Sequence, residues 1–304
     1  MISLDDAPEL ARFQDQPAQL PAASPGKVGA LRLGFERRDG RTILADLHRQ
    51  APLLVQQALY WDEAMPELAC VMMICTSGGT LQGDRYTIDV TLGPGTRAHL
   101  TTQSATKIQE MDANYASQVQ HLALADDAYL EYLPDPVIPY RHSRFVGRTV
   151  VSIAESATLL YAEILLPGRF HYGDGELFAY DLYSSGLTAV RPDGRELFVD
   201  KFVIQPEAFR PDNRAVMGDY RVLANVFLLT PPVQAERVLE RTPPTFGVNR
   251  IAAGASRLPN DAGLVYRVLG DETEPVRATV REFWALARGE VMGRPLMPPF
   301  GWRG

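Results

Sequence analysis

Cysteine is scarce in this sequence, with only Cys70 and Cys75 among 304 residues. Two cysteines exclude a disulfide framework, and their spacing is not that of a CxxC redox pair. They lie five residues apart in an apolar run, which places them on opposite faces of a predicted strand. We therefore expect two reduced thiols in the core of the protein.

Long apolar runs and basic clusters are also missing. No stretch reaches the roughly 18 consecutive apolar residues of a membrane-spanning helix. The N-terminus, MISLDDAPEL, is acidic and lacks the apolar core of a signal peptide. The net charge is -7, and no run of Lys and Arg interleaved with aromatic residues offers a surface for phosphate groups. We expect a soluble, cytoplasmic protein that binds neither membranes nor nucleic acid.

The usual signatures of catalysis and of tight metal binding are absent as well. The five histidines are scattered, with no HxH, HExxH or Cys/His cluster. The glycines at 78, 79 and 83 have neither the GxGxxG spacing nor a following GKS/T of a phosphate-binding loop. No GxSxG elbow positions a nucleophilic serine. These absences argue against a stable metal site, a nucleotide loop and a serine hydrolase.

The most informative stretch of the chain covers residues 77–107. A glycine-rich bend ends at Asp84, and apolar residues then alternate with polar ones from Tyr86 to Leu92. The Gly93-Pro94-Gly95 turn leads into a second alternating strand, from Ala98 to Thr102. This pattern predicts a β-hairpin.

A weak internal repeat determines the predicted fold. Three segments share the order strand, tight turn, strand, with turns about 30 residues apart: YTIDVTLGPGTRAHLTT, QVQHLALADDAYLEYLP and TVVSIAESATLLYAEIL. Since two short strands cannot bury an apolar face alone, neighbouring units must stack. We predict a mainly β fold in which stacked β-hairpins form a β-helix-like, solenoid-like arrangement. An ordinary sandwich or barrel is the alternative.

The remaining segments complete the expected organisation. Residues 1–26 are rich in Ala, Pro, Gln and Asp and predict a disordered leader. Residues 27–304 show no linker-like change in composition, so we expect one domain that includes a helical C-terminal region. Pro192-Asp193-Gly194 predicts a turn between two long strands.

Two helices are expected towards the C-terminus, at Val233–Arg241 and Pro275–Arg288. Asp271 or Thr273 could cap the second helix, and Gly289 is expected to end it. Four large residues of this helix share one face at helical spacing: Val276, Val280, Phe283 and Trp284. We expect this stripe either to dock on the β-structure or to form a surface that binds a partner protein.

Two carboxylates have unusual surroundings. Asp84 ends the glycine bend, and Glu163 has apolar neighbours on both sides. The period of a strand puts Glu163 on the same face as Leu159, Tyr161 and Leu165, so it should point inwards. A buried carboxylate must be paired, protonated or kept for a function. The structural alternatives are a turn cap for Asp84 and a bond to an arginine or backbone amide for Glu163. A stand-alone β-helical, carbohydrate-active enzyme that uses both carboxylates is one functional hypothesis.

Four blocks occur in order along the chain: SGGTLQGDR with AHLTTQSATKI, AYLEYLPDPVIPY, LLYAEILLPGR and VREFWALARGEVMGRP. With these blocks the chain resembles the UreD family of urease accessory proteins, called UreH in some bacteria, from about residue 28 to about residue 300. Ser77, Gln82 and the LPDPVIPY segment depart from the commoner family pattern, which indicates a subbranch.

The resemblance implies a function as well as a fold. It implies a non-enzymatic scaffold that works with UreF-like and UreG-like accessory proteins on apo-urease, while nickel(II) passes into the urease active site. It also implies a mainly β fold with two helices and a polar internal route for nickel. By motif position, Asp84, Thr106 and Glu163 match residues linked to that route. Oxygen ligands too few to trap the ion suit a metal in transit.

Overall fold

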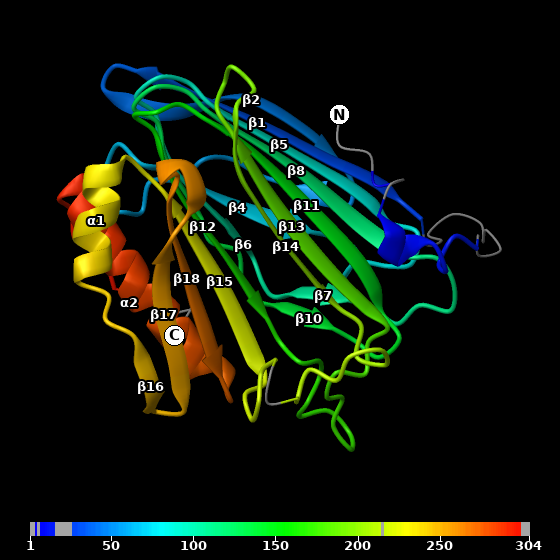
Figure 1. The fold of residues 1–304 in the computed structure, drawn as a ribbon. Coiled ribbons are helices and arrows are strands. Elements are labelled where there is room, and N and C mark those ends of the chain that lie inside the picture. Colours follow the sequence, from blue (N-terminus) through cyan, green and yellow to red (C-terminus); the bar gives the residue numbers. More distant parts are fainter. Residues whose placement is uncertain (1–3, 5–6, 16–25, 214–215, 299–304) are drawn as a thin grey trace.

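The computed structural model describes residues 4, 7–15, 26–213 and 216–298. In this part of the chain, strands predominate and form two packed sheets, with helices on the outer face of one sheet (Figure 1). The mainly β class predicted from the sequence is confirmed.

The first sheet has seven strands in the order β14-β13-β11-β8-β5-β1-β2. Strands β1, β5, β8, β11 and β13 are parallel to one another, and β2 and β14 join antiparallel at the two edges. In chain order the strands are β1 (Val28–Arg38), β2 (Arg41–Gln50), β5 (Arg85–Leu92), β8 (Ala116–Leu124), β11 (Arg144–Ile153), β13 (Leu182–Val190) and β14 (Glu196–Ile204).

The second sheet has eleven strands, nine of them in the order β16-β17-β18-β15-β12-β9-β6-β4-β3. Strands β7 and β10 pair with each other, and β10 also pairs with β12. The bounds are β3 (Leu53–Leu54), β4 (Ala69–Cys75), β6 (Arg97–Thr102), β7 (Thr106–Ile108), β9 (Tyr129–Tyr132), β10 (Val137–Pro139), β12 (Thr158–Leu165), β15 (Val222–Leu229), β16 (Thr245–Val248), β17 (Ile251–Arg257) and β18 (Gly263–Gly270).

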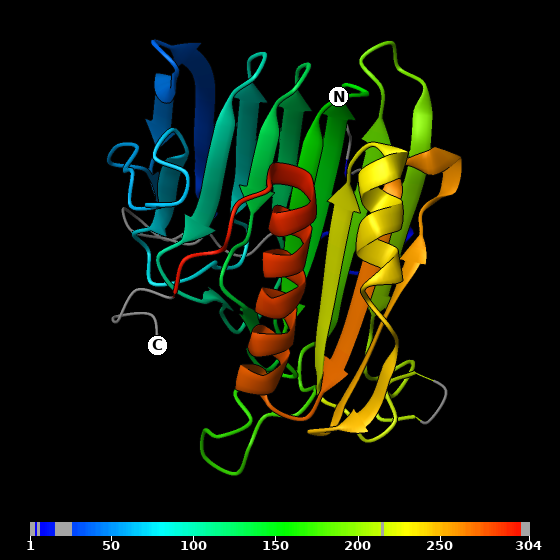
Figure 2. The ribbon, with the colours of Figure 1, turned by 90° about the vertical axis from the view of Figure 1, so that its left-hand side faces the viewer.

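Two α-helices, α1 (Pro232–Glu240) and α2 (Thr273–Met292), cover the outer face of the second sheet (Figure 2). The main apolar core lies between the sheets, and a second core lies between β12, β15, β18 and the helices. Of the helices in the described ranges, none has the length and apolar character to cross a membrane.

The three repeated segments form strands as expected, but the two strands of a unit do not pair with each other. β5 and β6 belong to different sheets, as do β8 and β9, and β11 and β12. Each tight turn is thus a corner between the sheets, and the hairpin predicted for residues 86–102 is wrong. The alternating pattern specifies which face is buried, and that face can be buried equally well against an opposite sheet.

Corresponding strands of successive units pair in parallel. Arg85 of β5 lies beside Ser117 of β8, and Arg97 of β6 lies beside Tyr129 of β9. The stack does not continue as a solenoid, because antiparallel strands complete both sheets. The β-helix-like arrangement is therefore corrected to two packed sheets of mixed strands. The predicted hairpin at Pro192-Asp193-Gly194 is confirmed by the antiparallel pair of β13 and β14.

Part of the predicted disordered leader is packed against the first sheet. Pro8–Leu10 form a short 3₁₀-helix, and Leu10 and Phe13 are buried beside Tyr115, Val146 and Leu182. Glu9 accepts hydrogen bonds from Arg148, Ser184 and Lys201. The buried side chains of Leu10 and Phe13 and the paired carboxylate of Glu9 thus hold this segment, which is otherwise polar in composition, on the first sheet. The rest of the predicted leader, residues 1–3, 5–6 and 16–25, lies outside the described residues.

Helix α2 is longer than the sequence predicts. It begins at Thr273 after Glu272, which makes no side-chain capping bond, and it continues through Gly289 to Met292. Gly293, with φ of 61°, ends the helix in the left-handed conformation that glycine adopts readily. The predicted caps, Asp271 and Thr273, are wrong, because Glu272 is the residue that precedes the helix. The predicted end at Gly289 is also wrong, because glycine inside a helix lowers stability without breaking the helix.

The apolar stripe of α2 packs on the second sheet. Val276, Val280 and Phe283 are buried in the core under the helix, and Trp284 is partly buried at its margin. This arrangement matches the docking alternative, and a partner could reach the three buried side chains only if the helix left the sheet.

Candidate functional site

A cavity of about 180 Å³ lies between the two sheets, beside β7 and β10. Four strands line it with neighbouring inward positions: Gln118 and Gln120 of β8, Gly147 and Thr149 of β11, Tyr161 and Glu163 of β12, and Tyr183 and Ser185 of β13. Further along β8 the inward residues are Leu122 and Leu124, which belong to the apolar core. The space between the sheets is therefore filled by apolar side chains at one end and holds a cavity with a mixed polar and apolar lining at the other.

Glu163 is one of two carboxylates among the described residues that line this cavity, and the other, Asp135, lies 3.5 Å from Arg277. Glu163's strand neighbours Leu159 and Tyr161 face the other sheet, and Leu160 and Ala162 face the helices, as the alternation predicts. The Tyr183 hydroxyl donates to one carboxylate oxygen, and Ser185 Oγ donates to the other at 2.8 Å. No lysine, arginine or histidine in the described ranges forms an ion pair with it. Burial raises the pKa of Glu163, and the two hydroxyl donors offset only part of that effect.

A network of neutral side chains lines the cavity beside Glu163. Gln120 Nε2 donates to Thr149 Oγ1 at 3.0 Å and to the Tyr161 hydroxyl at 3.3 Å, and its amide oxygen accepts from the Tyr132 hydroxyl. Gln118 and Gln120 are not among the residues predicted for the site from the sequence. Their period-two spacing with Leu122 and Leu124 is the signal that places them inside.

Asp84 does not line the cavity, and both of its carboxylate oxygens accept hydrogen bonds. One carboxylate oxygen accepts from the backbone N–H of Lys27 at 2.9 Å. The other accepts from the backbone N–H of Leu81 at 2.8 Å and from the Tyr86 hydroxyl at 2.6 Å. Asp84 is fully buried and joins the glycine bend to β1 and β5. The turn-cap alternative is the one that this geometry matches.

Thr106 and Cys75 lie at the wall of the same cavity. Thr106 begins β7, whose partner β10 holds this edge of the site. Cys75 ends β4 and is exposed, and its Sγ lies 3.2 Å from Ser77 Oγ, whereas Cys70 is buried. Both thiols are free, but the expectation of a core position is confirmed only for Cys70.

In the described ranges, no group of three or more His, Cys, Asp or Glu side chains is arranged to hold a metal ion.

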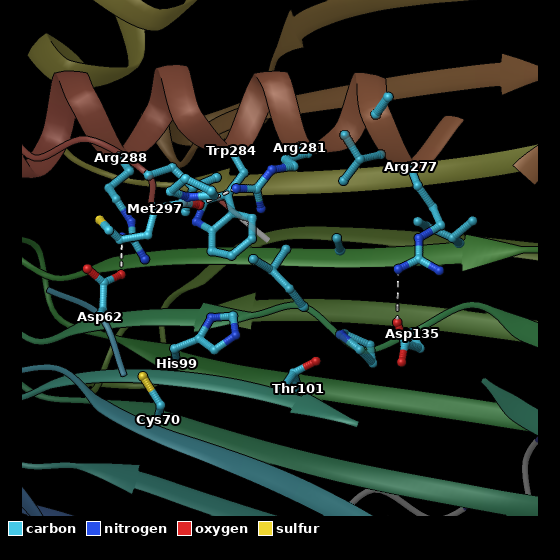
Figure 3. Close-up of a pocket in the computed structure, with 18 of the residues that line it drawn as sticks. Asp62, Cys70, His99, Thr101, Asp135, Arg277, Arg281, Trp284, Arg288 and Met297 are labelled. Atoms are coloured by element: carbon cyan, nitrogen blue, oxygen red, sulfur yellow. Dashed lines mark hydrogen bonds and ion pairs between the residues drawn. The ribbon is translucent and has the colours of Figure 1, made fainter. Parts of the chain in front are cut away.

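A buried ionic cluster lies on the other face of the second sheet, under α2 (Figure 3). Arg288 is fully buried and donates to both carboxylate oxygens of Glu131, each at 2.7 Å, and to Asp62. Glu131 also accepts from the Tyr129 hydroxyl at 2.6 Å and lies 3.1 Å from Nδ1 of His99. Since every charged member has a partner, the cluster links α2 to β9 without an unpaired charge.

Acid is expected to weaken the fold through Glu131. Burial alone would raise the pKa of Glu131, but His99 and Arg288 lower it from 4.5 to about 2. The folded chain thus holds the ionised form more strongly than the unfolded chain does. This stabilisation, of the order of 3 kcal/mol, is present above pH 4.5 and is lost as the pH falls towards 2.

Urea unfolding between pH 6 and pH 3 measures this dependence. The free energy of unfolding should fall more steeply with pH in the unmodified chain than in a Glu131→Gln variant. Glu155→Gln, which changes an exposed carboxylate, should follow the unmodified chain. Parallel curves for the unmodified chain and Glu131→Gln would contradict the assignment.

Comparisons with known proteins identify the family. The family model described as "UreD urease accessory protein" matches residues 27–303. "Urease accessory protein UreD 2" of Brucella suis biovar 1 is 55% identical over 300 residues, which cover 98% of this chain and 99% of that protein. "Urease accessory protein UreD 3" of Methylorubrum populi is 52% identical, with 99% and 97% covered. "Urease accessory protein UreD" of Yersinia pseudotuberculosis is 48% identical, with 98% and 93% covered.

These matches decide between the two hypotheses from the sequence. The hypothesis of a carbohydrate-active enzyme requires Asp84 and Glu163 in one active site. Asp84 does not line the cavity that contains Glu163, which argues against this hypothesis. The matches run along nearly the whole chain and share one description. The chain therefore belongs to the UreD family of urease accessory proteins, non-catalytic proteins that act in the maturation of urease.

Proposed function

We propose that nickel(II) on its way to apo-urease passes through the cavity between the sheets, and that Glu163 is its principal ligand there. The chain would do so in the cytoplasm as part of a complex with UreF-like and UreG-like proteins. The observation that supports this proposal is a carboxylate that lines an internal cavity of mixed polar and apolar side chains and has no ion-pair partner among the described residues.

The chemistry of the cavity suits an ion in transit. A buried carboxylate without a cationic partner carries a desolvation cost, and a divalent cation would offset that cost. Because burial already favours the protonated form of Glu163, an arriving cation would exchange with a proton. Thr106 and the hydroxyls of Tyr161 and Tyr183 add only neutral oxygen atoms to the lining. The second carboxylate of the lining, Asp135, already lies 3.5 Å from Arg277. One unpaired carboxylate with neutral oxygens binds nickel more weakly than a site of several histidines or thiolates, so the ion can leave.

Asp84 has no direct part in this proposal. Its oxygens already accept three hydrogen bonds, and breaking them to bind a metal would release the glycine bend. We infer that Asp84 acts on the route only by shaping the wall beside Tyr86, which lines the cavity.

Substituting Glu163 tests the proposal. Glu163→Gln keeps the shape of the side chain and removes its charge, so urease matured with this variant should contain at least tenfold less nickel per active site. The readouts are the nickel content and the activity of urease co-expressed with all accessory proteins, alongside a pull-down of the accessory complex.

Three further variants sharpen the result. Glu163→Asp keeps the charge and should retain more nickel loading than Glu163→Gln. Glu155→Gln, at an exposed position, should load nickel fully. Asp84→Asn should lower the thermal stability of the chain before it affects nickel loading. Full nickel loading with Glu163→Gln in an intact complex would refute the transit role, and loss of the complex itself would show that Glu163 is structural.

A further inference from the structure

A second cavity, of about 370 Å³, lies between α2 and the second sheet (Figure 3). Helix α2 forms its roof, β4 and β6 form its floor, and Leu296 to Pro298 close one side. The lining is mostly apolar, with Leu68, Met72, Ile164 and Trp61 among its residues. Cavities of this volume with few polar groups commonly bind small organic molecules.

The indole of Trp284 brings an unused hydrogen-bond donor to this cavity. Its Nε1 is buried and has no hydrogen-bond partner within the described part of the chain. Such donors are rare in folded proteins, because each lost bond costs free energy. The five other buried side-chain atoms without a partner belong to residues that line neither cavity: Ser143, Tyr180, Arg191, Gln234 and Asp271. Trp284 is thus the residue among these six that lines a cavity, and a ligand reaches its covered Nε1 only when the indole turns towards that space.

Arg281 brings an unused positive charge one helical turn away. Its guanidinium donates to the carbonyl oxygen of Met297 and lies 5.6 Å from the centre of the Trp284 ring. Among the described residues, no carboxylate forms an ion pair with Arg281. Burial and the nearby Arg288 lower the pKa of Arg281, as expected for a guanidinium without an anion beside it.

The other charged groups around the cavity are already paired. Arg288 is held by Asp62 and Glu131, and Arg277 lies 3.5 Å from Asp135. The Nδ1 of His99 is bonded to Glu131, and the His99 ring is stacked on Trp284 with centroids 5.2 Å apart. The guanidinium of Arg281 and the Nε1–H of Trp284 are therefore the groups left to bind a ligand, next to the apolar side chains of the lining.

We propose that this cavity binds a small organic carboxylate with an aromatic or aliphatic body. The carboxylate would accept from the guanidinium of Arg281 and from Nε1 of Trp284, and its apolar body would lie against the floor of the cavity. A metal cation is disfavoured there by Arg281, and a neutral ligand would leave its charge uncompensated. The site shares Pro134, Asp135 and Ile164 with the cavity of Glu163, but its ligand groups belong to α2 and the proposal does not depend on nickel transit.

A pair of nearly isosteric ligands tests the proposal on the unmodified full-length chain. Titration with 2-naphthoate should show saturable binding by calorimetry and should change tryptophan fluorescence, since Trp284 lies at the site. The neutral 2-naphthamide should bind at least about tenfold more weakly, because a hydrogen bond between charged groups is lost. Absence of naphthoate binding, or equal binding of acid and amide, would overturn the proposal.

Variants then assign the binding to this cavity. Arg281→Gln should weaken naphthoate binding by about tenfold or more and abolish the preference for the acid. Trp284→Phe keeps an aromatic ring without the N–H donor and should weaken binding by a smaller factor. Arg294→Gln, exposed and outside the lining, should bind as the unmodified chain does. Unchanged naphthoate binding by Arg281→Gln would place the ligand elsewhere and refute the site.

Discussion

An Arg288→Ala variant is expected to lose about 3–5 kcal/mol of its free energy of unfolding. The substitution removes the partner of two buried carboxylates at once, since Arg288 donates to both Glu131 and Asp62. Glu131 has no exposed surface, so water cannot replace the lost bonds without opening the packing under α2. Leaving such charges unpaired costs far more than losing a surface pair.

A second arginine of the helical layer provides the control. Arg241 follows α1 and pairs with Glu290 of α2, but its side chain is 65% exposed. Arg241→Ala should therefore cost less than about 1 kcal/mol. Urea unfolding of both variants measures the difference. Equal losses would mean that the cluster of Arg288, Glu131 and Asp62 adds nothing beyond an exposed ion pair.

Replacing Phe283 with alanine is expected to cost about 3–5 kcal/mol as well, for a different reason. Phe283 is buried under α2 and stacks on Tyr266 of β18 with ring centroids 4.4 Å apart. Removing the ring leaves a void that the paired strands β15 and β18 cannot close. The docking of α2 on the sheet is thus the interaction under test.

Phe246→Ala is the matched control, because this phenylalanine of β16 is 79% exposed. Its loss should change the free energy of unfolding by less than about 0.5 kcal/mol. Thermal unfolding and urea unfolding should both show a much larger loss of stability for Phe283→Ala than for Phe246→Ala. A small effect of Phe283→Ala, with binding of an accessory protein lost instead, would restore the alternative in which the stripe of α2 is a partner surface.

The buried face of a strand could be predicted from the sequence, because it depends only on the alternation of neighbouring residues. A period of two assigned Glu163, Tyr161 and Leu159 to one face of β12, and the structure turns that face towards the other sheet. Gly, Pro and Asp turns marked most strand ends for the same local reason. The spacing of the three repeats also foretold which strands correspond, and those strands are the ones that pair in parallel.

The choice of strand partners was not contained in these local patterns. An apolar face is buried equally well by a hairpin partner or by an opposing sheet, so β5 and β6 were placed in one hairpin although they belong to different sheets. The same ambiguity made the stack resemble a solenoid, which the antiparallel strands at the sheet edges exclude.

The sequence by itself determined the mainly β class, the inward direction of Glu163 and, through its four ordered blocks, the family. Only the tertiary structure decided which polar groups meet. Arg288 is 157 residues from Glu131 and 226 residues from Asp62, and no local period relates them. The bonds that occupy Asp84 likewise include one to Lys27, 57 residues away. Hydrogen bonds and ion pairs act over a few ångströms in space, so their partners follow from the packing of the sheets and helices rather than from spacing along the chain.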